Sequence, residues 1–368
     1  MNLLEDYGYK SDKILEKVIF TWKVLFEGKK SERIYFEADE NSAYILDEAH
    51  NVVRSSAMGA GLLICVQIDK KEFFDRLWKW MRTNMYISEG IHKGYFAWSC
   101  STDGEKLSDD IRPDAEQFAA TALLFASHRW GNGKGIFNYE KEALSLLHNM
   151  LHSKHPLFNK ENYLIRNQPD SDYSNPSFCM PHYYELYAMF ADIKDAEFWN
   201  KAAGAGREYI VRSCNKKTGL SSEQTLYDGT PLSAKERGTF FSMSYRVISN
   251  IGLFTTWFGD SPDFAEIASH IVSFFDGKKI EDFMDYEVNG TPRKRKARHP
   301  VALCATIAQA SLTLERCREP VSDKVKKQAK RAVKRFWETP LRKGKSRLYD
   351  NSLYFAALLS LSGLYKVY

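Results

Sequence analysis

The sequence predicts an all-α protein in which six helical hairpins close into an (α/α)6 barrel. In about twelve segments, apolar residues recur at the three-to-four-residue spacing of a helix face. Every second segment is more apolar than its neighbours, as expected when inner helices are covered on all sides and outer helices on one. These more apolar segments start near residues 56, 114, 177, 242, 299 and 351.

The expected helices are placed by this periodicity and by local start signals. Pro113, Ser242 and Pro300 each precede or open an apolar segment, as helix-starting residues do. Strand-like stretches are short, such as those at 33–36 and 95–98. In chain order the helices cover 11–27, 56–69, 71–86, 114–128, 139–154, 177–191, 195–213, 242–257, 261–276, 299–315, 321–337 and 351–364.

A helical-repeat solenoid is the rival architecture. Such repeats run over about 34–47 residues and show sequence identity from one repeat to the next, which this chain lacks. No stretch rich in Gly, Pro or Ser divides the sequence. A single (α/α)6-barrel domain over residues 1–368 is therefore expected.

Net charge and the lengths of the apolar runs argue against a nucleic-acid or membrane partner. The 52 Lys and Arg residues against 47 Asp and Glu give a net charge of +5, too small to indicate a nucleic-acid partner. No apolar run approaches the roughly 18–20 residues of a membrane span, and the first residues do not resemble a signal peptide. A cytoplasmic protein without a membrane partner is expected, either a monomer or a weak homodimer.

Cysteines and charged runs suggest no cofactor. Cys65 and Cys304 lie in apolar runs and are expected to be buried free thiols. No metal-ligand spacing or nucleotide-binding loop is present. The basic run at 293–298 is expected to be a solvated loop, or to rim a cleft because it precedes His299.

Distinctive polar and aromatic residues gather near the starts of the more apolar segments. They form the runs His-Lys-Gly-Tyr-Phe-Ala-Trp-Ser-Cys at 92–100, Ser-His-Arg-Trp-Gly at 127–131, Pro-His-Tyr-Tyr-Glu-Leu at 181–186, Tyr-Asp-Gly-Thr-Pro at 227–231, His-Pro-Val at 299–301 and Tyr-Asp-Asn at 349–351. In this order they resemble glycoside hydrolase family 8, most of all its reducing-end xylose-releasing exo-oligoxylanases. The resemblance implies an (α/α)6 barrel, an inverting mechanism and a cleft at the inner-helix N-termini.

The resemblance also implies where catalytic carboxylates should lie, and the chain has none there. The family's general acid, a Glu, falls on Ser56, and its general base, an Asp, falls on Met243. A further Asp of the family falls on Asn175. Near the acid position, Ala57 replaces a Gly and Ala60 replaces a Tyr. Because inverting glycosidases need one carboxyl group as acid and one as base, this chain lacks both groups at the expected places.

At the positions that the resemblance links to sugar contact, this chain matches the family better than at the acid and base positions. The resemblance implies that Asp114 contacts the central sugar, that Trp98 is a stacking platform and that His299 senses the reducing-end sugar. The expected binding residues are Arg54, Trp98, Asp114, Asn175, Tyr245, Arg246, His299, Tyr349 and Asp350.

Simpler structural roles are open for three of these residues. Asp114 follows Pro113 and suits a helix N-cap, Trp98 suits a core position, and His299 suits a hydrogen-bonded loop. Four acids are possible replacement carboxylates or simply surface acids: Glu89, Glu116, Glu223 and Asp228.

Two functions follow from these residues. The first is a degenerate family member that binds xylo-oligosaccharides or related β-glycans without hydrolysing them. The second is an active inverting glycosidase that uses a different carboxylate. Ser56 and Met243 favour the first.

Overall fold

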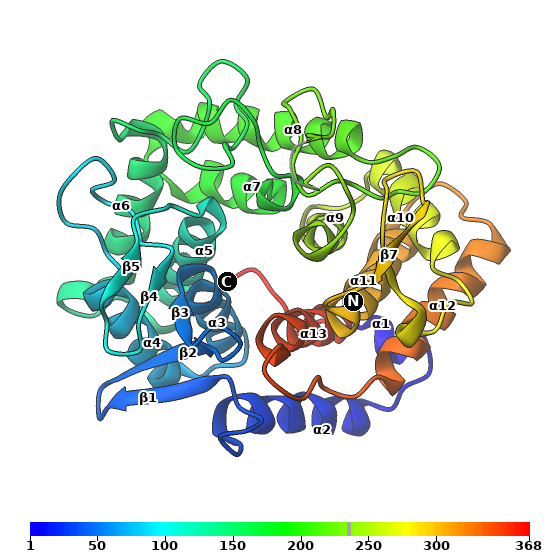
Figure 1. The fold of residues 1–368 in the computed structure, drawn as a ribbon, viewed down its shortest axis with the longest axis horizontal. Coiled ribbons are helices and arrows are strands. Elements are labelled where there is room, and N and C mark those ends of the chain that lie inside the picture. Colours follow the sequence, from blue (N-terminus) through cyan, green and yellow to red (C-terminus); the bar gives the residue numbers. More distant parts are fainter. Residues whose placement is uncertain (234–236) are drawn as a thin grey trace.

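The computed structural model describes residues 1–233 and 237–368, and it has the predicted (α/α)6-barrel architecture. In these residues, six inner helices form a closed ring in which each helix packs against the next and the last packs against the first (Figure 1). The inner helices are α3 (Ser55–Gln67), α5 (Pro113–Trp130), α7 (Pro181–Phe190), α9 (Tyr245–Phe258), α11 (Pro300–Arg316) and α13 (Arg347–Leu361).

The outer helices alternate with the inner ones along the chain. They are α2 (Ser11–Trp22), α4 (Lys71–Asn84), α6 (Tyr139–His152), α8 (Ala196–Ser213), α10 (Pro262–Phe274) and α12 (Asp323–Glu338). In α12 the buried residues recur at one-face spacing, from Ala329 through Ala332 and Val333 to Phe336, while α11 is buried along nearly its whole length. The difference follows from position, because only inner helices are covered on all sides.

Helix boundaries largely match those expected. Pro113 and Pro300 occupy the first position of α5 and α11, where a missing N–H carries no penalty. Two predicted helices, 177–191 and 242–257, begin three to four residues later than expected. Each is preceded by a 3-10 turn, Pro176–Phe178 and Ser242–Ser244 respectively.

Strands were the weakest part of the prediction. An antiparallel sheet contains β1 (Tyr35–Asp39), β2 (Ser42–Asp47), β3 (Val52–Arg54), β4 (Ser99–Cys100) and β5 (Lys106–Ser108). The strand expected at 95–98 is wrong, since only an isolated bridge joins Phe96 to Tyr86. The basic run expected to be a loop instead lies mostly in β7 (Pro292–Lys296), paired with β6 (Met284–Tyr286).

The C-terminal segment, residues 364–368, closes one end of the ring. Its backbone is held by side chains at the C-terminal ends of inner helices: Trp257 donates to the carbonyl of Tyr365 at 3.1 Å, and Gln67 bonds both backbone groups of Lys366. Figure 1 shows this segment running into the middle of the ring. The opposite end of the ring, where the inner helices begin, is not covered by this segment.

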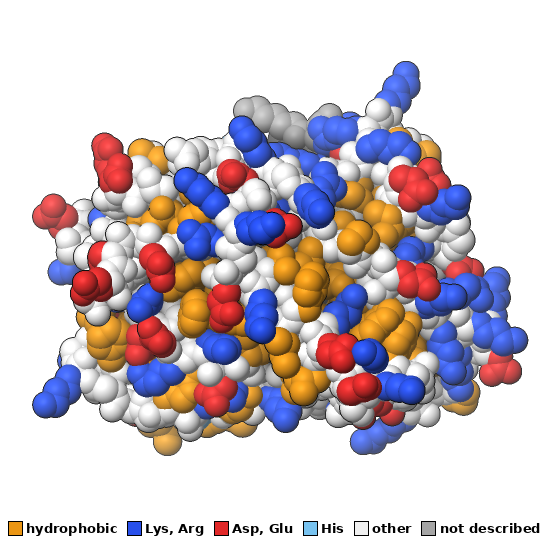
Figure 2. Space-filling model, turned by 90° about the horizontal axis from the view of Figure 1, so that it is seen from below, with side chains coloured by type: hydrophobic (Ala, Val, Ile, Leu, Met, Phe, Trp, Pro, Cys, Tyr) orange, Lys and Arg blue, Asp and Glu red, His pale blue; other side chains and the backbone are white. Residues whose placement is uncertain are grey.

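The surface offers no membrane span. Among the described residues, no helix is both long enough and apolar enough to cross a bilayer. Figure 2 shows the outer face that contains α2, where charged side chains of both signs are scattered and hydrophobic side chains lie between them. Cys65 and Cys304 are buried free thiols, as expected.

A glycine lets two neighbouring inner helices, α9 and α11, approach closely. A Cβ on Gly252 of α9 would lie 2.8 Å from the backbone oxygen of Gln309 in α11. A Cβ on Gly204 of the outer helix α8 would meet nothing nearer than a flexible Arg207 nitrogen at 3.9 Å. The two positions therefore differ in packing although both are helical.

We expect Gly252→Ala and Gly204→Ala to change stability in opposite directions. The first forces α9 and α11 apart and should lower the free energy of unfolding by about 1–3 kcal/mol. The second only restricts the unfolded chain and should raise it by about 0.5–1 kcal/mol. Urea unfolding monitored by circular dichroism measures both. Equal effects of the two changes would contradict this account of the helix contact.

A buried carboxyl group lies under the first turn of α5. Glu116 is fully buried, accepts a hydrogen bond from the Phe96 backbone N–H at 2.8 Å, and leaves its Oε2 without a partner among the described residues. Burial raises the pKa of Glu116 to about 8, and the nearby Asp114 carboxylate adds to the rise. Between about pH 4.5 and pH 8, the folded protein therefore keeps a proton on Glu116 that the unfolded chain releases.

Glu116→Gln should raise stability at pH 8 and change it little near pH 4.5. Wild-type stability falls as pH rises from the ordinary carboxyl pKa of 4.5 towards about 8, because the unfolded state ionises first. Gln removes that penalty, so the difference should grow to about 3–4 kcal/mol at pH 8. Thermal unfolding across this pH range tests the prediction, and a difference independent of pH would contradict it.

Candidate functional site

A cavity of about 490 Å³ opens where the inner helices begin. Its polar upper part, which we call the mouth, contains Ser56, Trp98, Asp114, Met243 and His299. Nine of the eleven positions to which the resemblance gives a catalytic or binding role line this cavity: Arg54, Ser56, Trp98, Asp114, Asn175, Met243, Arg246, His299 and Tyr349.

Two expected binding residues do not line the cavity. Tyr245 and Asp350 are both fully buried beside it. The Tyr245 hydroxyl has no partner among the described residues. Asp350 acts on its neighbours instead, as described below.

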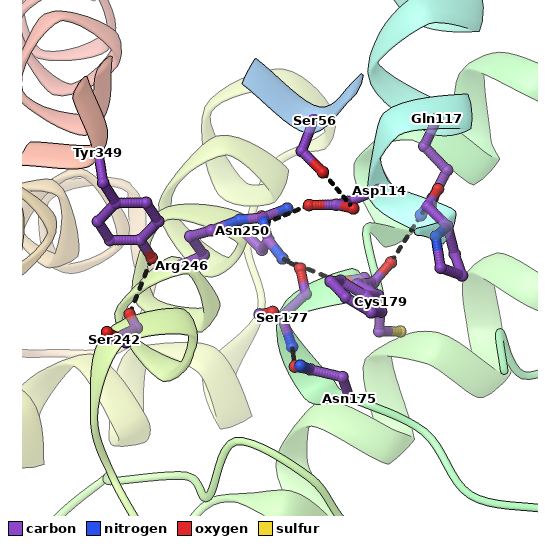
Figure 3. A network of polar contacts seen from close by, with 12 residues as sticks. Ser56, Asp114, Gln117, Asn175, Ser177, Cys179, Ser242, Arg246, Asn250 and Tyr349 are labelled. Carbon is purple, nitrogen blue, oxygen red and sulfur yellow. Dashed lines mark hydrogen bonds and ion pairs between the residues drawn. The ribbon is translucent and has the colours of Figure 1, made fainter. Parts of the chain in front are cut away.

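Asp114 is the centre of the polar contacts in the mouth (Figure 3). The Ser56 hydroxyl donates to its Oδ1 at 2.8 Å, and Arg246 Nη1 donates to its Oδ2 at 2.6 Å. The N-cap role expected for Asp114 is wrong: Arg112 is the N-cap, because Pro113 takes the first helical position. Arg246 Nη2 is buried without a partner among the described residues, so one donor beside the cavity is unused.

The positions that correspond to acid and base hold no ionisable group. Ser56 lies in the first turn of α3, and its hydroxyl donates a hydrogen bond to Asp114. Met243 lies in the 3-10 turn before α9, and a thioether cannot take a proton from water near neutral pH. Ser56 and Met243, the two positions to which the family resemblance gives the acid and base roles, thus both line the cavity, and neither side chain carries a carboxyl group.

Three carboxylates line the cavity within the described residues, and each contacts a cation. Asp114 pairs with Arg246, as above. Asp47 binds Arg54 Nε at 3.0 Å and His50 at 2.8 Å. Each of the three carboxylates therefore already takes part in an ion pair.

The third carboxylate, Glu223, is the one replacement candidate that lines the cavity. Its side chain is 5% exposed and contacts Arg237. Burial raises the pKa of Glu223, and the Arg237 guanidinium opposes that rise. Of the other candidates, Glu89 and Asp228 are exposed and Glu116 is buried outside the cavity lining.

Trp98 is half-buried at the mouth, and its ring is contacted by two arginines. The guanidinium carbons of Arg54 and Arg112 lie 4.4 and 4.6 Å from its ring centroid. The Trp98 carbonyl accepts the Ser55 backbone N–H at 3.1 Å, which fixes the loop to the start of α3. A sugar that stacks on Trp98 therefore shares the ring with, or displaces, a guanidinium.

His299 is held by a carboxylate behind it. Its Nδ1 lies 3.0 Å from Asp350 Oδ2, while Asp350 Oδ1 accepts the Ala302 backbone N–H at 2.9 Å. The Tyr349 ring packs against the imidazole of His299, with ring centroids 4.7 Å apart. Its hydroxyl donates a hydrogen bond to the carbonyl of Ser242 at 2.8 Å. Asp350 therefore orients His299, and Tyr349 ties the turn that carries Met243 to α13.

Asn175 supports the backbone at the edge of the cavity. Its Oδ1 accepts the Ser177 N–H at 2.9 Å, which caps the 3-10 turn before α7 (Figure 3). An aspartate would make the same contact, so this substitution leaves the local backbone supported.

Sequence reasoning missed the residues below and beside the mouth. Arg112 and Arg237 carried no motif, and their roles depend on loop positions. His182, which belongs to the 181–186 run but was not among the expected binding residues, lines the cavity from α7, and Asn250 and Gln309 line it from α9 and α11. Helical spacing from the motif residues could have indicated them, since Asn250 lies one turn after Arg246.

Comparison with known proteins agrees with this geometry. Residues 32–314 match glycosyl hydrolases family 8. The reducing end xylose-releasing exo-oligoxylanase of Halalkalibacterium halodurans is 44% identical, over 100% of this chain and 94% of that protein. The exo-oligoxylanase Rex8A of Paenibacillus barcinonensis is 42% identical, over 100% and 96%. A mutant reducing-end-xylose releasing exo-oligoxylanase complexed with xylobiose superposes with a TM-score of 0.95 at 44% identity, covering 100% of this chain and 96% of that one. The chain therefore belongs to glycosyl hydrolases family 8.

Proposed function

We propose that this protein binds xylo-oligosaccharides or related β-glycans in the cavity and does not hydrolyse them. The observation that carries the proposal is the pair Ser56 and Met243, which line the mouth where the family's acid and base are expected. General acid–base groups accelerate such reactions by about 10²–10⁴-fold each. Without both, cleavage should approach the uncatalysed rate.

Retained polar groups support binding. Asp114 has two donors in place and faces the cavity, and the unpaired Arg246 Nη2 offers a further donor. His299 is oriented through Nδ1 by Asp350, which leaves Nε2 for a ligand. Relatives complexed with xylose and xylobiose make pentose oligosaccharides the first ligands to try.

A second candidate function, hydrolysis, is favoured by one observation. Glu223 lines the same cavity, is nearly buried and has a raised pKa. A carboxyl group with a raised pKa is the form that a general acid requires. Its contact with Arg237 works against this role, because the guanidinium stabilises the ionised form.

We expect no release of reducing sugar from xylotriose by the wild-type protein, and some release by the double variant Ser56→Glu with Met243→Asp. A Glu at 56 would lie beside the Asp114 carboxylate, and repulsion between like charges raises the pKa that an acid needs. Activity should appear with inversion at the anomeric carbon, measured by NMR. The matched control is Ser56→Gln with Met243→Asn, which adds similar volume and no acid.

Wild-type turnover that disappears in Glu223→Gln would overturn the non-hydrolytic proposal and establish the second candidate. Rescue is expected to be partial, because a misplacement of about 1 Å can reduce rates about a hundredfold. Equal activity of the carboxylate and amide double variants would show that the restored rate does not come from acid–base chemistry.

Trp98→Ala should weaken xylotriose binding about tenfold or more, because truncating a stacking anchor removes about 1–3 kcal/mol. Isothermal calorimetry measures the affinity. Trp130→Ala is the matched control, since Trp130 is also half-buried but lies at the far end of α5, outside the cavity lining. An unchanged affinity in Trp98→Ala would contradict the platform role.

A further inference from the structure

The cavity continues below the mouth into the barrel. Along α3 it is lined by Ser56, Ala60 and Ile64, which share one helix face over two turns. At 1.5 Å per residue these eight steps span about 12 Å. The helices α9 and α13 contribute similar stripes. We call this lower part the shaft; its lining is mostly apolar and consists of Ala60, Ile64, Phe118, Leu253, Leu353 and Ala356, with the polar side chains of Asn250 and Gln309 among them.

Small or incompletely covered side chains keep the shaft open. Ala60, Phe118, Leu353 and Ala356 all lie on the interior faces of inner helices, yet each remains partly exposed. Protein interiors are normally packed to the density of organic crystals, so apolar surface left accessible inside a barrel is unusual. This surface is available to an apolar ligand group.

A buried histidine in the cavity wall lacks a partner. His182 of α7 lines the cavity, is fully buried, and has no hydrogen bond at either ring nitrogen among the described residues. Burial lowers its pKa to about 3, so the ring is neutral and offers one donor and one acceptor. Buried polar atoms of this kind normally have partners, and an imidazole without one is unusual in the wall of a cavity.

The base of the cavity is aromatic and closed. Tyr183 and Tyr365 line it, and Tyr365 also stacks on Trp257 with ring centroids 5.7 Å apart. The ring of His182 packs against Tyr183 at 4.3 Å. His182, Tyr183 and Tyr365 are at most 5% exposed and form the wall behind the shaft, so the surface accessible to a ligand is that of Ala60, Phe118, Leu353 and Ala356.

We infer that the shaft binds an aromatic group attached to the sugar that occupies the mouth, so that the ligand is an aryl glycoside or an aryl-substituted oligosaccharide. The inference rests on the proposed sugar site for the position of the glycosyl part. The cavity volume of about 490 Å³ is within the range of about 300–1,000 Å³ typical of small-molecule sites. The polar mouth and the apolar shaft thus match the two halves of such a ligand.

Calorimetry with three probes tests the inference: methyl β-D-xylopyranoside, 4-nitrophenyl β-D-xylopyranoside and 4-nitrophenol. The aryl glycoside should bind at least about tenfold more tightly than the methyl glycoside, because burying a ring in apolar surroundings favours binding. Its binding should also show the more negative heat-capacity change. Ala60→Phe and, separately, Ala356→Leu fill the shaft and should cancel the aryl advantage while the methyl glycoside binds as before.

Ala205→Phe in the outer helix α8 is the matched control, since Ala205 is partly buried and lies outside the cavity lining. It should keep the aryl advantage. Equal affinities for the two glycosides in the wild type, as expected of a water-filled shaft, would overturn the inference, and so would an aryl advantage that survives both shaft variants.

The sugar site and the shaft can fail separately. If neither glycoside binds but 4-nitrophenol binds and is excluded by Ala60→Phe, the proposed sugar site is wrong and the shaft remains an aromatic site. Release of 4-nitrophenol from the glycoside would overturn only the non-hydrolytic proposal.

Discussion

The mouth of the barrel depends on one buried ion pair, between Asp114 of α5 and Arg246 of α9. Both side chains are at least nine-tenths buried, at 1% and 7% exposure. Removing one partner of such a pair leaves an uncompensated charge and typically costs about 3–5 kcal/mol. Asp114 also lies in the first turn of α5, where the helix dipole favours a negative charge. The pair thus joins two inner helices that are not adjacent in the ring, at the point where ligand enters.

The remaining polar residues of the mouth are arranged around this pair by local contacts. Ser56 reaches Asp114 from α3. On another side of the mouth, Asp350 orients His299, and Tyr349 fixes the turn that contains Met243. These contacts involve the backbone or a neighbouring helix, so they do not depend on a carboxyl group at position 56 or 243. The arrangement of polar side chains in the mouth is therefore fixed by contacts within the fold.

The sequence predicted the barrel well because inner and outer helices bury different fractions of their surfaces. That difference is encoded directly in apolar periodicity, whereas short strands such as β7 depend on a partner strand that periodicity does not indicate. The error at Asp114 was avoidable, since a proline at the first helical position makes the preceding residue the N-cap. The nine expected residues that line the cavity were found through the family resemblance.

Other features required the fold itself. Arg112 and Arg237 act through pairings across loops, with Trp98 and Glu223, that no local pattern indicates. The shaft could not be predicted, because an alanine at an interior position is compatible with both a tight helix contact and an open cavity. Gly252 packs directly against α11, whereas Ala60 faces open space.

The charge balance in the mouth depends on the residue at position 56. With Ser at position 56, the Asp114–Arg246 pair has no competing carboxylate beside it, and Ser56 stabilises Asp114 with a neutral hydrogen bond. A second carboxyl group there would be repelled by Asp114 and held protonated, which is useful to a catalyst and costly to a resting site. Catalysis requires contacts that strengthen in the transition state. Under the proposed non-hydrolytic function that arrangement would give the site no advantage, which agrees with a serine at position 56 and a methionine at position 243.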